Sequence, residues 1–165
     1  MVAKNFQPQL HHFEQTCQNA GLKVTHQRLE IYGELLRAHD HPAAETLYKR
    51  LEKRFPSLSL DTVYRTLATF EKLHLVQRLE TVKSQARYEV LACRHHHFLC
   101  DTCGRIVDFA WPSFDAMPPP PDLAAIGAID RTAVVVHGTC RACIEAARKN
   151  STPDQTALPE LSRPL

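Results

Sequence analysis

No apolar run in this sequence approaches the roughly 20 residues needed to cross a bilayer. The first 24 residues contain neither a continuous apolar segment nor a small-residue cleavage site, so they do not resemble a signal peptide. We therefore expect a cytoplasmic protein without a membrane partner. In that compartment thiols stay reduced, and paired cysteines more often bind metal than each other.

A strong excess of one charge is also missing. Lysine and arginine together number 20 and aspartate and glutamate 18, for a formal net charge of +2. The small basic excess lies in the first 90 residues. It is too small to indicate nucleic-acid binding without a motif.

Between residues 6 and 74 the apolar residues recur at helical spacing. This pattern predicts four helices with recognisable ends, marked by Gly21 after the first, Thr25 before the second, Pro42 in the first turn of the third, and Ser59 or Asp61 before the fourth. Two short strand-like segments, 75–81 and 86–92, follow the helices. This order is typical of a winged helix-turn-helix domain.

From residue 91 onward the pattern changes to strands and turns. Apolar residues alternate after His95, and residues 131–138 predict a buried strand. The proline run 118–121 excludes a regular helix or central strand at that point. We expect one domain over 1–90, a second over 91–149, and a disordered, proline-rich tail over 150–165.

Four of the six cysteines form two CxxC pairs, Cys100 with Cys103 and Cys140 with Cys143. Two residues between cysteines let both thiolates turn onto one ion, and two such pairs complete the tetrahedral shell of a structural Zn²⁺. Two disulfides or a redox-active dithiol are the alternatives, and the expected compartment disfavours the first. A site closed by four thiolates has no open position for a reaction.

The consecutive histidines at 95–97 indicate a different kind of site. On a strand, His95 and His97 point to one face and His96 to the other. Glu89 and Asp108 lie in neighbouring strand-like segments, and His41 lies at the bend before the third helix; together these nitrogen and oxygen donors suit iron, manganese, zinc or nickel. Sequence spacing alone does not bring His41 or Asp108 to the cluster.

Several motifs together resemble the ferric uptake regulator (Fur) superfamily of bacterial metal-dependent repressors. They are "AGLKVTHQR", "HPAAETLY", "TVYR", "HHHFLCDTCGRIVDF" and "HGTCRAC", and the resemblance covers roughly residues 10–147. It implies an α+β protein, with an N-terminal winged helix-turn-helix DNA-binding domain followed by a small α/β dimerisation domain. It also implies a homodimeric repressor that binds double-stranded DNA. Such a protein is not an enzyme and has no small-molecule substrate.

The resemblance assigns two metal sites. It places Zn²⁺ at the four CxxC cysteines and a regulatory Fe²⁺ or Mn²⁺ at His41, Glu89, His95, His97 and Asp108. Such an ion would fix the angle between the two domains, and hence the spacing of two recognition helices in the dimer. Tyr64 and Arg65 match the DNA-contacting positions, and Lys23 matches a lysine that enters an A·T-rich minor groove; the implied operator is an A·T-rich inverted repeat.

The branches of the superfamily differ in the signal that they sense. The peroxide sensors (PerR) of the superfamily resemble this chain at Asp108 and in the second CxxC pair; in them, iron and peroxide oxidise a histidine that matches His41 or His95. Glu89 instead matches the iron-responsive regulators, which are the alternative. Zinc sensors (Zur) typically have a cysteine at the position of Glu89, so that branch fits less well.

Some residues fall outside these two sites. A further family metal site matches Arg94, His96, Asp115 and Thr132, two of which are poor ligands, so we expect that site to be absent. Cys17 is expected to be a buried apolar residue and Cys93 a bystander thiol. Outside the superfamily, a redox-regulated zinc chaperone could share the four-cysteine site, but it would have no use for the helix-turn-helix.

Overall fold

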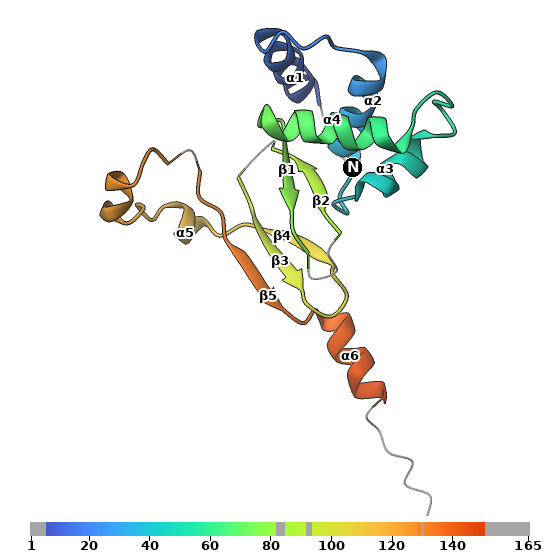
Figure 1. Ribbon diagram of the computed structural model, residues 1–165. Coiled ribbons are helices and arrows are strands. Elements are labelled where there is room, and N and C mark those ends of the chain that lie inside the picture. Colours follow the sequence, from blue (N-terminus) through green and yellow to red (C-terminus); the bar gives the residue numbers. More distant parts are fainter. Residues whose placement is uncertain (1–5, 82–84, 92–93, 130, 151–165) are drawn as a thin grey trace, which may run out of the picture.

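The computed structural model describes residues 6–81, 85–91, 94–129 and 131–150, and it divides them into a helical half and a β-rich half (Figure 1). The helical half runs through α1 (Gln7–Asn19), α2 (His26–Arg37), α3 (Ala44–Leu51), α4 (Leu60–Lys72), β1 (Val76–Leu79) and β2 (Arg87–Val90). The β-rich half contains β3 (His96–Cys100), β4 (Ile106–Phe109), α5 (Pro112–Asp115), a 3-10 helix (Pro121–Ala125), β5 (Val135–Gly138) and α6 (Arg141–Asn150). Within the described ranges no helix has the length and apolar character to cross a membrane.

The predicted helix ends are largely confirmed. Gly21 follows α1 with φ +65°, the left-handed conformation that glycine adopts without strain. The side chain of Thr25 accepts a hydrogen bond from the Arg28 amide, and that of Ser59 accepts one from the Thr62 amide, so both cap their helices. Ser59, not Asp61, is therefore the cap of α4.

The prediction for Pro42 was wrong. Helix α3 begins at Ala44, so Pro42 lies before the first turn of the helix. Its carbonyl accepts a hydrogen bond of 3.1 Å from the Tyr88 amide on β2. Pro42 therefore makes a tertiary contact with a strand residue 46 positions away in sequence. Local helix propensity carries no information on such a contact.

The four helices close around one apolar core. The rings of Phe13 and Tyr32 stack with centroids 4.4 Å apart, and Phe70 from α4 meets both rings edge-on. Burying a side chain such as Leu67 of α4, which is fully buried, stabilises the fold by about 1.5–3 kcal/mol. This burial holds one face of α4 in the core and leaves the opposite face exposed.

Strands β1 and β2 lie in the two predicted strand-like segments and form an antiparallel pair, in which Val76 lies opposite Val90. The inner residues of both strands complete the same core. Helices followed by this small sheet confirm the winged helix-turn-helix arrangement.

The second sheet has the order β4-β3-β5, with β3 antiparallel to β4 and parallel to β5 (Figure 1). Between β4 and β5 the chain leaves the sheet as an arm, on which the four-residue α5 and the 3-10 helix are the only helical turns among the described residues. No α-helix or strand covers the proline run 118–121, as expected, and the 3-10 helix begins at its last residue, Pro121.

One expectation for this sheet was wrong. The segment 131–138 forms a strand only over Val135–Gly138, and the strand is exposed: Val135 is 48% and Val136 36% accessible. Val135 and Val136 point to opposite faces of the sheet, so β5 is partly accessible on both faces. The expected disorder of the tail and the expected role of Cys93 concern residues outside the described ranges, apart from Asn150, which ends α6.

Candidate metal centres

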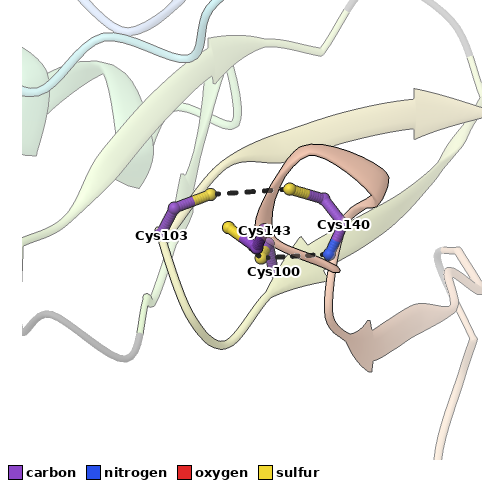
Figure 2. Close-up of side chains that lie close together, drawn as sticks. All are labelled: Cys100, Cys103, Cys140 and Cys143. Carbon is purple, nitrogen blue, oxygen red and sulfur yellow. Dashed lines mark hydrogen bonds between the residues drawn. The ribbon is translucent and has the colours of Figure 1, made fainter. Parts of the chain in front are cut away.

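The four CxxC cysteines meet where the second sheet joins α6 (Figure 2). Cys100 ends β3 and Cys103 lies in the turn to β4, while Cys140 and Cys143 lie at the start of α6. The turn closes through a hydrogen bond of 2.8 Å from the Gly104 amide to the Cys100 carbonyl, and Gly104 has a left-handed φ of +74°. The parallel pairing of β3 with β5 then brings the second pair beside the first.

The sulfur spacing fits a zinc ion. The sulfurs of Cys100 and Cys143 lie 3.9 Å apart, and those of Cys103 and Cys140 lie 3.8 Å apart. Four sulfurs at about 2.3 Å from a tetrahedral zinc lie about 3.8 Å from one another, whereas a disulfide requires about 2.05 Å. The four thiols are free in the structure, and their separation matches a shared ion.

The electrostatics of the four thiols also call for a cation. Main-chain N–H groups of Cys140, at 3.2 Å, and of Cys103 point at the Cys100 sulfur and lower its pKa to about 6. The neighbouring thiols of Cys140 and Cys103 raise the pKa of Cys143 to about 12. The four-cysteine cluster therefore favours one thiolate and opposes the formation of a second. A divalent ion at its centre would relieve the repulsion between neighbouring thiolates.

The second cluster joins the two halves of the molecule. His41, Glu89, His95, His97 and Asp108 each offer one ligand atom, and these atoms all lie within 4.8 Å of one another. His41 comes from the bend between α2 and α3 and Glu89 from β2, whereas the others come from β3, its lead-in and β4. The antiparallel register places His97 directly opposite Asp108.

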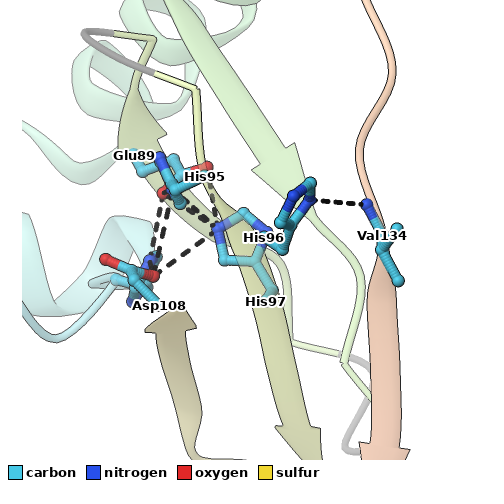
Figure 3. A network of polar contacts seen from close by, with 7 residues as sticks. Glu89, His95, His96, His97, Asp108 and Val134 are labelled. Atoms are coloured by element: carbon cyan, nitrogen blue, oxygen red, sulfur yellow. Dashed lines mark hydrogen bonds and ion pairs between the residues drawn. The ribbon is translucent and has the colours of Figure 1, made fainter. Parts of the chain in front are cut away.

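The ligand atoms in this second cluster converge on one point (Figure 3). The Glu89 Oε2 atom lies 3.0 Å from Nε2 of His41, 3.0 Å from Nε2 of His95 and 3.2 Å from Nε2 of His97. Two of the ring nitrogens, those of His95 and His97, are themselves only 3.0 Å apart. Adjacent donors around an octahedral ion with bonds of about 2.1 Å lie about 3.0 Å apart, so the cluster has the dimensions of a coordination shell.

Burial and charge act against each other in the cluster. Burial alone would raise the pKa of Glu89, but hydrogen bonds with His41 and His97 lower it well below its usual range. Burial alone would lower the pKa of His41, but the Glu89 and Asp108 carboxylates raise it. The carboxylates thus favour positive charge at the centre. A metal ion would supply that charge while the imidazoles stay neutral and coordinate it.

The backbone around His41 is specialised. His41 has φ +46°, a left-handed conformation uncommon for a residue other than glycine. The preceding residue, Asp40, binds Arg50 of α3 through two contacts of 2.6 and 3.3 Å, which pin the bend. The sequence does not reveal this supporting pair, because a spacing of ten residues across a bend carries no periodic signal.

His96 turns away from this cluster, as the alternation along β3 predicts, and its ring meets Val134 instead (Figure 3). A cavity of about 260 Å³ between α2 and β2 opens onto the second cluster, at His41, His95 and Asp108. His41 and His97 are almost fully buried, while the Asp108 side chain is 49% exposed. Small molecules can therefore approach the cluster from the Asp108 side.

The residues predicted to contact DNA lie on the exposed surface of the helical half. Tyr64 and Arg65 lie on α4, and the Tyr64 hydroxyl donates a hydrogen bond of 2.5 Å to Glu45 of α3. Lys23 precedes α2, and its carbonyl accepts a 2.6 Å hydrogen bond from Arg28. Arg28 and Arg65 line one hollow between α2 and α4. Sequence analysis missed Glu45 and Arg28, which only the packing of the helices brings to this surface.

Comparison with known proteins agrees with this geometry. The family model described as "Ferric uptake regulator family" matches residues 19–119. The "Peroxide-responsive repressor PerR" of Staphylococcus epidermidis is 30% identical over 79% of this chain and 87% of its own length. The "Peroxide operon regulator" of Bacillus subtilis is 31% identical over 78% and 89%.

A solved structure is similar over most of the chain. The Helicobacter pylori ferric uptake regulator Fur, described as having three functional metal binding sites, superposes with a TM-score of 0.69. It is 26% identical, and the match covers 86% of this chain and 95% of that one.

Proposed function

Because the chain belongs to the ferric uptake regulator family, we propose that it is a metal-dependent repressor of the peroxide-responsive kind, with Fe²⁺ or Mn²⁺ as corepressor. Proteins of this family are dimeric DNA-binding regulators. The observation that carries the proposal is the second cluster, which draws His41 from the helical half and His97 and Asp108 from the second sheet. We call it the regulatory cluster.

An ion in the regulatory cluster supplies the positive charge that the carboxylates favour and links the two halves. His41 holds the helical half to it, and His97 and Asp108 hold the sheet. In a dimer, the angle between the halves sets the distance between the two copies of α4, which must match half-sites about 34–36 Å apart on one face of the duplex. The ion then binds the DNA-competent arrangement more tightly, and DNA tightens the ion by the same factor.

We assign DNA recognition to the exposed face of α4. Arg65, with a side chain 82% exposed, can bond guanine through two hydrogen bonds, and the ring of Tyr64 can contact a thymine methyl group. Lys23 is placed to enter a minor groove, which favours an A·T-rich operator; a two-fold dimer requires an inverted repeat. The DNA-binding domain is residues 1–90 and the dimerisation domain 91–149.

We propose that the four-cysteine cluster holds Zn²⁺ as a staple of the dimerisation domain. Four thiolates leave no open coordination position, so the site binds no substrate and supports no reaction. The chain accordingly acts by binding DNA and metal and not as an enzyme.

The proposed signal is hydrogen peroxide. Bound iron would supply the redox chemistry, and the net change would transfer one oxygen atom from the peroxide to a histidine ring and release water. His95, 19% exposed beside the cavity, and His41, which is buried, are the target rings. An oxidised ring is a poorer donor, so the ion leaves and the two halves uncouple. The names of the relatives and the carboxylate Asp108 support this signal.

One observation favours an iron-responsive regulator as a second candidate. Glu89, rather than an aspartate, lies at the centre of the regulatory cluster and accepts contacts from three imidazoles. In that case iron occupancy alone controls DNA binding, and peroxide leaves the histidines intact.

The test is a gel-shift assay with an A·T-rich inverted repeat, with and without Mn²⁺, followed by mass spectrometry of iron-loaded protein after peroxide. We expect Mn²⁺ to promote binding, and one oxygen to be added to the peptide that carries His41 or His95. Asp108→Asn should lose the Mn²⁺ response, while Asp122→Asn, on the exposed 3-10 helix, should keep it. A protein that binds no such DNA under any metal condition is not this repressor, and the zinc-chaperone alternative would then gain support.

A further inference from the structure

A second polar cluster lies on the opposite face of β3 from the regulatory cluster, with Arg94 at its centre. The Arg94 Nε lies 2.6 Å from Oδ1 of Asp115 on α5, and its Nη1 donates to the Asp115 carbonyl at 3.4 Å. Its Nη2 donates to the Thr132 hydroxyl, shortly before β5. One guanidinium thus joins three segments: the start of β3, the arm and the lead-in to β5.

His96 completes this cluster from β3. The ring is fully buried and packs against aromatic rings of the arm and β4, with centroids 5.5 Å from Phe109, 6.4 Å from Trp111 and 5.3 Å from Phe114. Its Nδ1 accepts a 3.1 Å hydrogen bond from the Val134 amide (Figure 3). The ring proton of neutral His96 is therefore on Nε2, which faces Asp115 Oδ1 at 3.3 Å.

We infer that Arg94 is the resident cation of this cluster and takes the place of a divalent metal ion there. The Helicobacter pylori Fur is described with three functional metal binding sites, whereas the described residues of this chain form two clusters with metal-ligand spacing. His96 and Arg94 both lie beside the Asp115 carboxylate, and Arg94 also binds the Thr132 hydroxyl. The group that contacts both oxygen donors is a guanidinium, which carries a fixed charge and no lone pair.

The geometry leaves no room for both cations. A divalent ion bound to Asp115 would lie about 2.1 Å from the carboxylate oxygen. The Arg94 Nε already lies 2.6 Å from that oxygen, so an ion there would meet a positive charge at contact distance. The Nδ1 lone pair of His96 is already taken by the Val134 amide. The residues present therefore do not fit a third ion.

The consequence is that the arm is fastened to β3 without metal. The ion pair and the aromatic contacts hold α5 against the face of β3 opposite His95 and His97. The segment that carries His95 and His97 is thus held on its opposite face, whether or not the regulatory cluster contains an ion. We expect each protomer to bind one exchangeable divalent ion in addition to its zinc.

The test counts bound Co²⁺ in the zinc-loaded full-length protein by equilibrium dialysis and elemental analysis. Co²⁺ binds nitrogen donors but ranks below Zn²⁺ in affinity, so the zinc stays in place. We expect one exchangeable Co²⁺ per protomer in the wild type, and one more when Arg94→His is combined with Thr132→His, which replaces the cation by donors. Arg105→His, an exposed arginine between β3 and β4, is the matched control and should add none.

Trp111, the only tryptophan in the chain, reports on the same cluster, because its ring packs against His96. Co²⁺ bound beside it should quench its emission in the double variant. Two results would overturn the inference. The first is a second exchangeable Co²⁺ in the wild type that Asp115→Asn removes. The second is no additional Co²⁺ in a double variant whose Trp111 emission matches the wild type. The single Co²⁺ expected in the wild type rests on the proposed function, whereas the ion added in the double variant and its effect on Trp111 do not.

Discussion

Replacing His41 by asparagine should detach the bend between α2 and α3 from the regulatory cluster without unfolding either half of the molecule. His41 is the only histidine that the helical half contributes to the regulatory cluster, and it is 5% exposed. Asparagine tolerates the left-handed backbone at φ +46°, so His41→Asn removes an imidazole with little backbone strain. The remaining donors, Glu89 of β2 and those in and next to the second sheet, still bind an ion, but that ion no longer holds the bend before α3.

The size of the effect follows from linkage. At a free Mn²⁺ concentration one hundred times the wild-type Kd, binding stabilises the fold by about 2.7 kcal/mol. Removing a supporting partner of a metal site weakens binding about 10–100-fold, and removing a direct ligand should cost at least as much. At the same Mn²⁺ concentration the stabilisation then falls to about 0.4–1.4 kcal/mol or less. With about 2–4 °C per kcal/mol, the Mn²⁺-induced rise in Tm should fall from about 5–11 °C to about 1–6 °C.

Hydrogen exchange distinguishes uncoupling from simple weakening. At saturating Mn²⁺, amides in α2 and α3 and in β3 and β4 should gain protection in the wild type, whereas in His41→Asn only β3 and β4 should gain it. His74→Asn is the matched control: His74 also has a positive φ, of +54°, but lies outside the cluster. Equal protection of both halves in His41→Asn would refute the argument that His41 transmits the metal signal.

Three further predictions test the other elements. Cys143→Ser should break the four-thiolate shell and release zinc, measured by a colorimetric chelator. Helix α6 should then lose protection from proteolysis, because Cys143 lies in its first turn and Cys140 directly precedes it. Arg65→Ala should weaken operator binding by about 1–3 kcal/mol in a gel shift, with Asp61→Ala on the same face as the control. Leu67→Ala should lower the free energy of unfolding by about 2–5 kcal/mol in urea, because Leu67 is fully buried in the core; a loss under 1 kcal/mol would mean the core relaxes around the cavity.

The sequence predicted the helical half well because its signals are local. Thr25 and Ser59 cap helices within the same turn, and Gly21 ends α1 through its own φ. The one failure in this half, Pro42, depends on Tyr88 in a distant strand. Propensity and capping act over three or four residues and carry no information on such a contact.

In the second half, strand positions were predicted but burial was not. The apolar run around Val135 matched a buried strand, yet the side chains of β5 are exposed in the protomer. Hydrophobic periodicity indicates that a strand has an apolar face. It does not indicate whether residues of the same chain bury that face.

The two metal clusters divide in the same way. Because CxxC spacing and strand alternation are local geometry, the sequence by itself determined that each cysteine pair turns onto one point and that His95 and His97 share a face which His96 does not. Only the tertiary structure decided which residues complete each cluster. The register of β3 with β4 sets Asp108 opposite His97, and the bend pinned by Asp40 carries His41 across from the other half. The tertiary structure also decided that Arg94 takes the place of an ion, because the partners of a side chain depend on packing between segments far apart in sequence.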